Sequence, residues 1–180
     1  MRSASKAWVL AGIAVLSTLS LASPLAAAGK AAKTALSIET IVRGNLSPFG
    51  SGTASGTFTL DLGPSSDSGK LTLKYTYGSL RRTGAGQKFQ PGERTETLRG
   101  KYGTLVIHTI GRQFPVGVEN PRDPQGDSAV WLGNFSIIRG TGRYAGLQGG
   151  GGVAGIIEIS LGVGISSDYF HRYEGLVTRS

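Results

Sequence analysis

The chain has 180 residues with 29 glycines and no cysteine, and its 19 basic residues outnumber its 11 acidic ones. Without cysteine it has neither disulfides nor thiolate metal ligands, so we expect one domain held together by its hydrophobic core. The basic residues are scattered rather than interleaved with aromatic ones, and this argues against a nucleic-acid partner.

Residues 1–28 have the three parts of a secretory signal peptide. Arg2 and Lys6 form a positive start, residues 7–22 are apolar and uncharged, and three alanines precede Gly29. We therefore expect cleavage before Gly29 and a mature protein that is secreted or held in the cell envelope. A retained membrane anchor is the alternative, but the apolar run is shorter than the ~20 residues that span a bilayer.

Cleavage would change the charge balance only moderately. It removes two of the 19 basic residues and leaves 17 against 11 acidic ones, a net charge of +6. We expect a flexible N-terminus over residues 29–34 and a single domain over 35–180, with no membrane span after cleavage. The alanine-rich leader and glycine-rich chain are typical of a bacterial protein.

From residue 35 onward, apolar residues alternate with polar ones instead of recurring every three or four positions. This pattern predicts no helix and eight strands with turn-rich connections. It favours an all-β fold, a single eight-stranded antiparallel up-and-down barrel, with a sandwich as the alternative. The strands are expected at residues 36–43, 54–62, 70–77, 94–99, 103–112, 129–138, 151–161 and 168–178.

The segment 139–155 is rich in glycine and contains one aromatic residue, Tyr144. A P-loop would need Lys and Ser/Thr after the glycines, and a dinucleotide fold would need a helix, which these glycines disfavour. We therefore expect a tight hairpin between two strands, in which at least one of Gly140 and Gly142 has φ > 0.

The run Arg139-Gly140-Thr141-Gly142-Arg143-Tyr144-Ala145-Gly146, with Gly149 and Gly151 after it, resembles the late Gly-x-Gly-x-Tyr/Phe-x-Gly hairpin of the allene oxide cyclase and dirigent group of β-barrels. Residues 103–107 and 131–136 resemble the same barrel in small secreted bacterial proteins. The resemblance covers most of residues 54–160 and implies an eight-stranded antiparallel barrel, often assembled as a trimer.

The resemblance also implies two kinds of activity. The plant cyclases steer an unstable epoxide with a glutamate and a bound water, and the dirigent proteins orient radical coupling with acidic groups. Neither set of residues aligns with this chain, so none is carried over, and the fold alone does not assign a function.

Few residues point to catalysis or to a metal site. The two histidines, His108 and His171, are not spaced as metal ligands, and no Gly-x-Ser-x-Gly elbow is present. We expect no metal and no cofactor, and the sequence assigns no catalytic residue. Four strand carboxylates fall mostly on polar faces, which argues against a buried catalytic acid: Glu39, Asp61, Glu158 and Glu174.

Aromatic residues share faces of two predicted strands. They either fill the barrel core, with their polar tips bonded to neighbours, or line a small-molecule pocket. The candidate ligand-binding residues are Tyr75, Tyr77, Trp131, Tyr169, His171 and Tyr173. In the loop after Tyr77, Arg81, Arg82 and Lys88 are candidates for a basic rim that attracts an anionic ligand, or for a solvated loop.

Successive connections of an up-and-down barrel alternate between its two ends. The connections at residues 44–53, 78–93, 113–128 and 162–167 share one end; three of them are long, and two of those run to about fifteen residues. Long loops over a rigid scaffold often carry function. We therefore expect the ligand mouth at that end and the glycine hairpin at the other.

Three functions remain open. The leading one is an exported barrel that binds a small hydrophobic or aromatic molecule without catalysis. The second is a cyclase or isomerase that shapes a reactive intermediate. The third is a cell-envelope interaction protein with a filled barrel. A homo-oligomer, a trimer by the resemblance, is compatible with each.

Overall fold

The structure is a computed structural model that describes residues 32–43, 50–116, 127–160 and 166–180. The expected signal peptide and its cleavage position lie outside the described residues. The described elements are β1 (Thr34–Val42), β2 (Ser51–Leu62), β3 (Ser65–Tyr77), β4 (Arg81–Arg82), β5 (Lys88–Gly100), β6 (Gly103–Pro115), β7 (Asp127–Gly140), the short 3₁₀ turn η1 (Gly142–Tyr144), β8 (Leu147–Ser160) and β9 (Ser166–Arg179).

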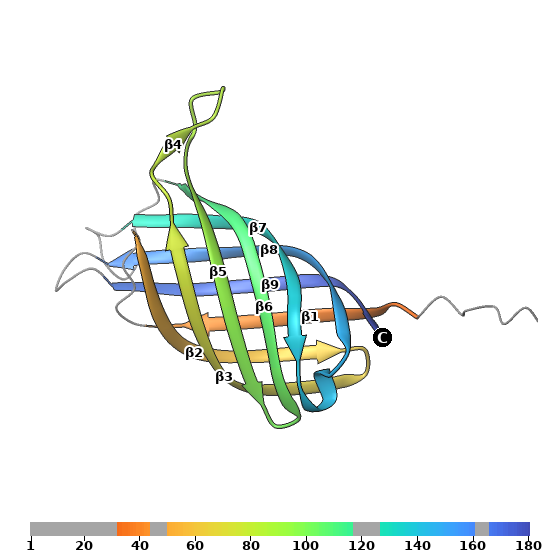
Figure 1. Ribbon diagram of the computed structural model, residues 1–180. Helices are drawn as coiled ribbons and strands as arrows, with labels where there is room; N and C mark the ends of the chain where they lie inside the picture. Colours follow the sequence, from red (N-terminus) through yellow and green to blue (C-terminus); the bar gives the residue numbers. More distant parts are fainter. Residues whose placement is uncertain (1–31, 44–49, 117–126, 161–165) are drawn as a thin grey trace, which may run out of the picture. The chain divides into compact units, whose positions relative to one another are not determined.

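Eight of these strands close into an antiparallel barrel (Figure 1). Strands adjacent in the sequence are adjacent in the barrel, β9 pairs back with β1, and β3 pairs with β5 past the short β4. The predicted eight-stranded up-and-down barrel is therefore confirmed. Every barrel strand has a partner on both sides, so the hydrogen-bonding groups of a free sheet edge are not exposed.

The strands extend beyond their predicted bounds, because polar residues continue the alternation past the apolar ones. The largest difference lies in the segment 78–93, which was expected to be a loop. Arg81–Arg82 form β4, which pairs with Lys88 and Phe89 at the start of β5. The prediction of a loop was wrong here, since exposed charged residues gave no apolar alternation to read.

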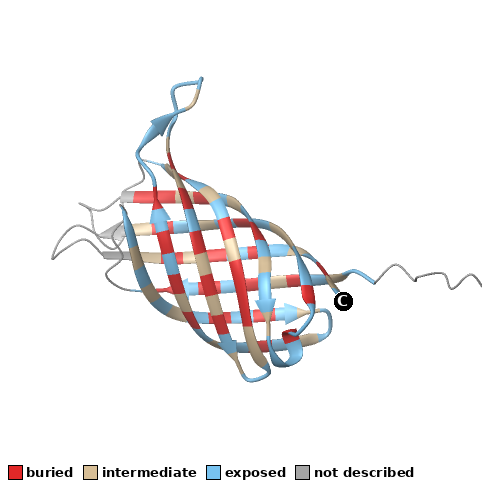
Figure 2. Cartoon of the chain, viewed as in Figure 1, coloured by how far each residue is buried: buried red, intermediate tan, exposed pale blue. Residues whose placement is uncertain are grey.

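Buried and exposed residues alternate along the barrel strands (Figure 2), as they do where side chains point in turn to the lumen and to the solvent. On β3, Tyr75 and Tyr77 share the inner face as expected, together with Leu71 and Leu73, and all four are buried. On β9, Tyr169, His171 and Tyr173 share the buried face as expected, and Arg172 and Glu174 lie on the exposed face.

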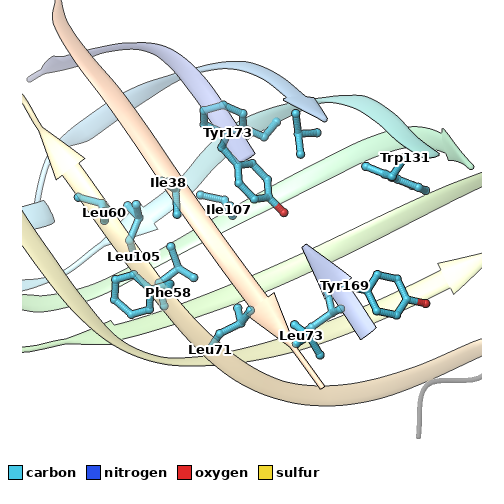
Figure 3. Packing of buried hydrophobic residues seen from close by; sticks show 14 of the residues in the cluster. Ile38, Phe58, Leu60, Leu71, Leu73, Leu105, Ile107, Trp131, Tyr169 and Tyr173 are labelled. Atoms are coloured by element: carbon cyan, nitrogen blue, oxygen red, sulfur yellow. The ribbon is translucent and has the colours of Figure 1, made fainter. Parts of the chain in front are cut away.

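The connections sort between the two ends as expected. The short connections β2–β3, β5–β6 and β7–β8 share one end, and the other four share the long-connection end. The lumen differs accordingly. Aliphatic side chains and Phe58 fill the half near the short connections, while Trp131 and Tyr169 lie apart from Phe58, Leu60 and Leu105 (Figure 3).

Asp67 and Tyr144 close the short-connection end. The Tyr144 hydroxyl donates to Asp67 Oδ2 at 2.5 Å, and Asp67 also accepts backbone N–H groups from Ser68, Lys101 and Tyr102. Burial alone would raise the pKa of Asp67, but these hydrogen bonds outweigh it and lower the pKa. The carboxylate thus joins β3, the β5–β6 turn and the glycine hairpin.

The glycine hairpin is confirmed between β7 and β8, and its glycines serve two purposes. Gly142 has φ +59°, in the left-handed region expected for at least one glycine of the pair. Gly140 has no such φ. Instead, a Cβ on Gly140 would lie 2.0 Å from the carbonyl oxygen of Tyr144. Because Gly140 has no side chain, the backbone of Tyr144 can pack directly against it, and the Tyr144 hydroxyl reaches Asp67.

Candidate functional site

All six candidate ligand-binding residues point into the barrel and are at most 5% exposed. The structure brings four of them, Tyr77, Trp131, Tyr169 and His171, together around a residue that the sequence analysis did not select, Arg94. We call these five residues the lumen cluster. It lies in the half of the lumen toward the long connections.

The two other candidates lie beside the cluster. The rings of Tyr75 and Tyr77 are 5.3 Å apart. Tyr173 lies one inward position further from the long-connection end than His171, and their ring centroids are 6.3 Å apart.

Three glycines on the inner wall make room for the lumen cluster. A Cβ on Gly92 would lie 2.5 Å from the Tyr77 ring, and one on Gly111 would lie 2.7 Å from Trp131 Cζ2. A Cβ on Gly155 would lie 2.1 Å from Cδ2 of His171. The aromatic rings and the imidazole therefore fit into this narrow barrel because the strand positions that they contact are glycines.

Arg94 reaches from β5 into the centre of the cluster. Its guanidinium carbon lies 3.7 Å from the centroid of the Trp131 ring and 5.1 Å from that of Tyr169. Its Nη2 donates to the Tyr77 hydroxyl at 2.7 Å, and its Nη1 donates to Nε2 of His171 at 2.6 Å. Aromatic faces and neutral acceptors therefore hold the cation, and within the described residues no carboxylate forms an ion pair with it.

His171 is neutral in this arrangement. A guanidinium N–H can only donate, so the Nε2 atom of His171 must accept and carries no proton. Burial and the positive charge of Arg94 both hold the pKa of His171 well below its ordinary value. The imidazole is thus a hydrogen-bond acceptor for Arg94 rather than a second cation.

A buried carboxyl lies one inward position beyond Arg94 on β5. Glu96 is 1% exposed and accepts a hydrogen bond from the hydroxyl of Tyr173, while its Oε2 has no partner among the described residues. Burial raises the pKa of Glu96, although the Tyr173 hydrogen bond and Arg94 oppose the shift. Burial, followed by the nearby Glu96 charge, also raises the pKa of Tyr173.

The sequence analysis missed Arg94 and Glu96 because the stretch 94–99 carries charged residues and threonines in alternation, with a single apolar residue, Leu98. Counting back by two from Leu98 would have placed both charged residues on the inner face. Two carboxyls outside the four considered, Asp67 and Glu96, are buried. Of the four, Glu39, Asp61 and Glu174 are exposed as expected.

The three proposed rim residues lie on the β4 hairpin and are exposed. This hairpin projects beyond the barrel at the long-connection end (Figure 1). The guanidinium of Arg82 donates to the carbonyl of Gly86 within the hairpin at 3.2 Å. Arg81, Arg82 and Lys88 therefore stand outside the lumen, and none of them contacts the lumen cluster in the described part of the chain.

The outer wall carries a hollow of about 480 Å³ over β1, β9, β8 and β7. An apolar row crosses it, with Ile41 opposite Phe170, Phe170 opposite Ile156, and Ile156 opposite Val130. Ile156 is 52% exposed.

In the described ranges, no three His, Asp or Glu side chains gather as metal ligands would, and no helix is long and apolar enough to cross a membrane.

Comparison of the chain with protein-family models, with curated proteins and with solved structures finds no match. A functional assignment must therefore come from the geometry of the site itself.

Proposed function

We propose that the protein is an exported barrel that binds a small hydrophobic or aromatic molecule, without catalysis, at the long-connection end of its lumen. The observation that carries this proposal is the division of the lumen. One half is mainly aliphatic, with Phe58 among its side chains, whereas the half under the long connections gathers Arg94, Trp131 and two tyrosine hydroxyls. Apolar walls with a few convergent polar groups are typical of small-molecule sites.

A second function, catalysis of the cyclase or isomerase type, is favoured by Glu96. A buried carboxyl whose pKa is raised, hydrogen-bonded to a tyrosine, resembles the acids that enzymes use for proton transfer. Such an enzyme would place its substrate against Glu96 and Tyr173, deeper in the lumen than the cluster. With this second function we also propose that the protein belongs to the allene oxide cyclase and dirigent group, which its glycine hairpin resembles.

The third function, a filled barrel that acts through its outer wall, is favoured by the exposed apolar row over β1, β9, β8 and β7. Exposed apolar surface of this kind often marks contact with another protein. A homo-oligomer formed through this wall is compatible with it.

Native mass spectrometry of the protein purified from its host tests the leading proposal. We expect the folded protein to retain an organic adduct that denaturation releases. Tyr169→Leu, at the long-connection end, should lose this adduct, while Phe58→Leu, in the aliphatic half, should keep it. If the native protein carries no adduct and also binds none of a panel of small aromatic molecules in calorimetry, the proposal is wrong.

A further inference from the structure

Six polar atoms of the lumen are buried without a hydrogen-bond partner among the described residues; two of them are Oγ1 of Thr40 on β1 and Oε2 of Glu96, and the other four come from neighbouring strands. These four are Nε of Arg94, Oγ1 of Thr109, Oε1 of Gln113 and Nε1 of Trp131. All four side chains are at most 5% exposed. Buried polar groups are nearly always hydrogen-bonded, so a group of four orphans in one half of a lumen needs a physical explanation.

The four atoms come from three adjoining strands. Arg94 on β5 lies opposite Thr109 on β6, and Gln113 on β6 lies opposite Trp131 on β7. Between Thr109 and Gln113, the inward position of β6 is Gly111, and the Trp131 ring covers it. The guanidinium of Arg94 in turn stacks on the Trp131 ring. The orphan atoms therefore belong to side chains on one continuous part of the inner wall, across β5, β6 and β7.

The chemistry of this region is that of a donor site. Arginine Nε–H and indole Nε1–H can only donate, and the Thr109 hydroxyl can donate as well. The Gln113 amide can present either its oxygen or its nitrogen, because the two ends are assigned only from their neighbours. Since the two Nη atoms of Arg94 bond His171 and Tyr77, its Nε edge is the part left for another group.

The buried positive charge of Arg94 also favours an anionic ligand in this region. Arg94 is fully buried, its hydrogen-bond partners are neutral, and the nearby Glu96 is drawn toward its uncharged form. A buried cation is costly unless an anion or strong acceptors compensate it. The guanidinium of Arg94 and the donors of Thr109 and Trp131 match the oxygens of an oxyanion. Charge-assisted hydrogen bonds of this kind are stronger than neutral ones.

We propose that the ligand of this barrel carries an oxyanion, such as a carboxylate, that binds against Arg94, Thr109 and Trp131. This rests on the proposed function, since it assigns the head group of the molecule that the long-connection end takes up. The aromatic or aliphatic body of the ligand then lies toward Tyr77 and Tyr169, nearer the long connections. The ligand class is that of small aromatic or aliphatic carboxylates.

The test compares phenylacetate with two uncharged analogues of the same size, phenylacetamide and 2-phenylethanol, by calorimetry on the full chain. We expect phenylacetate to bind about tenfold more tightly or better, as one lost charged hydrogen bond predicts. Arg94→Gln should abolish this preference. Arg172→Gln, which removes an exposed arginine on the outer wall, should leave it unchanged.

The indole proton of Trp131 reports on the site directly. In a Trp8→Phe chain Trp131 is the one remaining tryptophan, so a ¹H–¹⁵N spectrum shows one indole signal. We expect phenylacetate to move this signal downfield and 2-phenylethanol to leave it in place. Should Arg94→Gln fail to fold, Thr109→Val and Trp131→Phe each remove one donor and should each weaken phenylacetate about threefold or more.

The outcomes separate the two proposals. Equal binding of phenylacetate and its uncharged analogues would overturn the oxyanion assignment and leave the binding function standing; water would then satisfy the orphan atoms. Binding of phenylacetate that survives Arg94→Gln, or survives both single-donor variants, would also overturn it. Failure of all three probes and of a wider aromatic panel to bind would overturn the binding function itself.

Discussion

At the residue scale, the molecule contains two hydrogen-bonded pairs of a tyrosine and a carboxyl group. Folding lowers the pKa of one carboxyl group and raises the pKa of the other. Asp67 accepts a hydrogen bond from Tyr144 and three more from backbone N–H groups, so its pKa is lowered. Glu96 accepts one from Tyr173 and is buried deep in the lumen, so its pKa is raised. The depth of burial and the number of donors at each carboxylate together decide the sign.

Asp67→Asn should cost stability at pH 7 and little at pH 3. Because the folded protein lowers the pKa of Asp67, the carboxylate stabilises the fold above its ordinary pKa of 3.8, and this contribution is lost as the pH falls through the lowered value. Urea unfolding of the wild type and the variant at several pH values measures it. A stability difference that grows toward acid would contradict the account.

Glu96→Gln should behave in the opposite way. A carboxyl whose folded pKa is raised stabilises the fold below its ordinary pKa of 4.5, and this contribution is lost as the pH rises through the folded value. Relative to the wild type, Glu96→Gln should therefore gain stability between pH 4 and pH 8. If the variant instead loses stability over this range, Glu96 is ionised in the folded protein.

Tyr144→Phe removes one hydroxyl from the closure of the short-connection end. We expect it to lower the free energy of unfolding by about 1.5–3 kcal/mol, the usual contribution of a hydrogen bond to a charged group. Tyr102→Phe is the matched control, since Tyr102 is 39% exposed in the turn beside Asp67, and it should change stability by less than about 0.5 kcal/mol. Equal effects of the two variants would show that the hydroxyl contact is unimportant.

At the scale of elements, the glycine hairpin is the segment whose sequence is most closely tied to its structure. Gly142 is needed for its backbone conformation and for space, since a Cβ there would lie 2.3 Å from the carbonyl oxygen of Tyr102. Gly140 is needed for space alone, which Tyr144 takes. The hairpin could be predicted from the sequence because glycine signals a turn. The packing of Tyr144 on Asp67 could not, because the two residues are 77 positions apart and meet only when the barrel closes.

Alanine substitutions separate these roles. Gly142→Ala should destabilise the protein by at least about 1 kcal/mol, through backbone strain and through the overlap of its Cβ with the carbonyl oxygen of Tyr102. Gly140→Ala should cost about 1–3 kcal/mol through overpacking against Tyr144. Gly152→Ala is the control, since a Cβ there meets nothing within 4 Å and φ lies outside the left-handed region. Urea midpoints that are equally lowered in all three variants would contradict this division.

At the scale of the whole molecule, the sequence predicted the eight strands, their order and the end at which each connection lies, because alternation and turn signals are local. It also placed the six aromatic and histidine candidates on the inner face. It did not predict that Arg94 would be the centre of the cluster, since Leu98 is the single apolar residue that marks the inner face of this strand and a charged residue is not expected there. Closure of β3 on β5 buries it.

The central claim is that the half of the lumen under the long connections is the binding site. Backbone amide shifts of the ¹⁵N-labelled protein titrated with phenylacetate test it most directly. The account predicts saturable shifts at the end of β3 near Tyr77, at Gly92–Glu96 of β5 and at Tyr169–Tyr173 of β9, with residues 140–150 unchanged. Shifts confined to the glycine hairpin or to the outer apolar row, or no saturable shift at all, would contradict it.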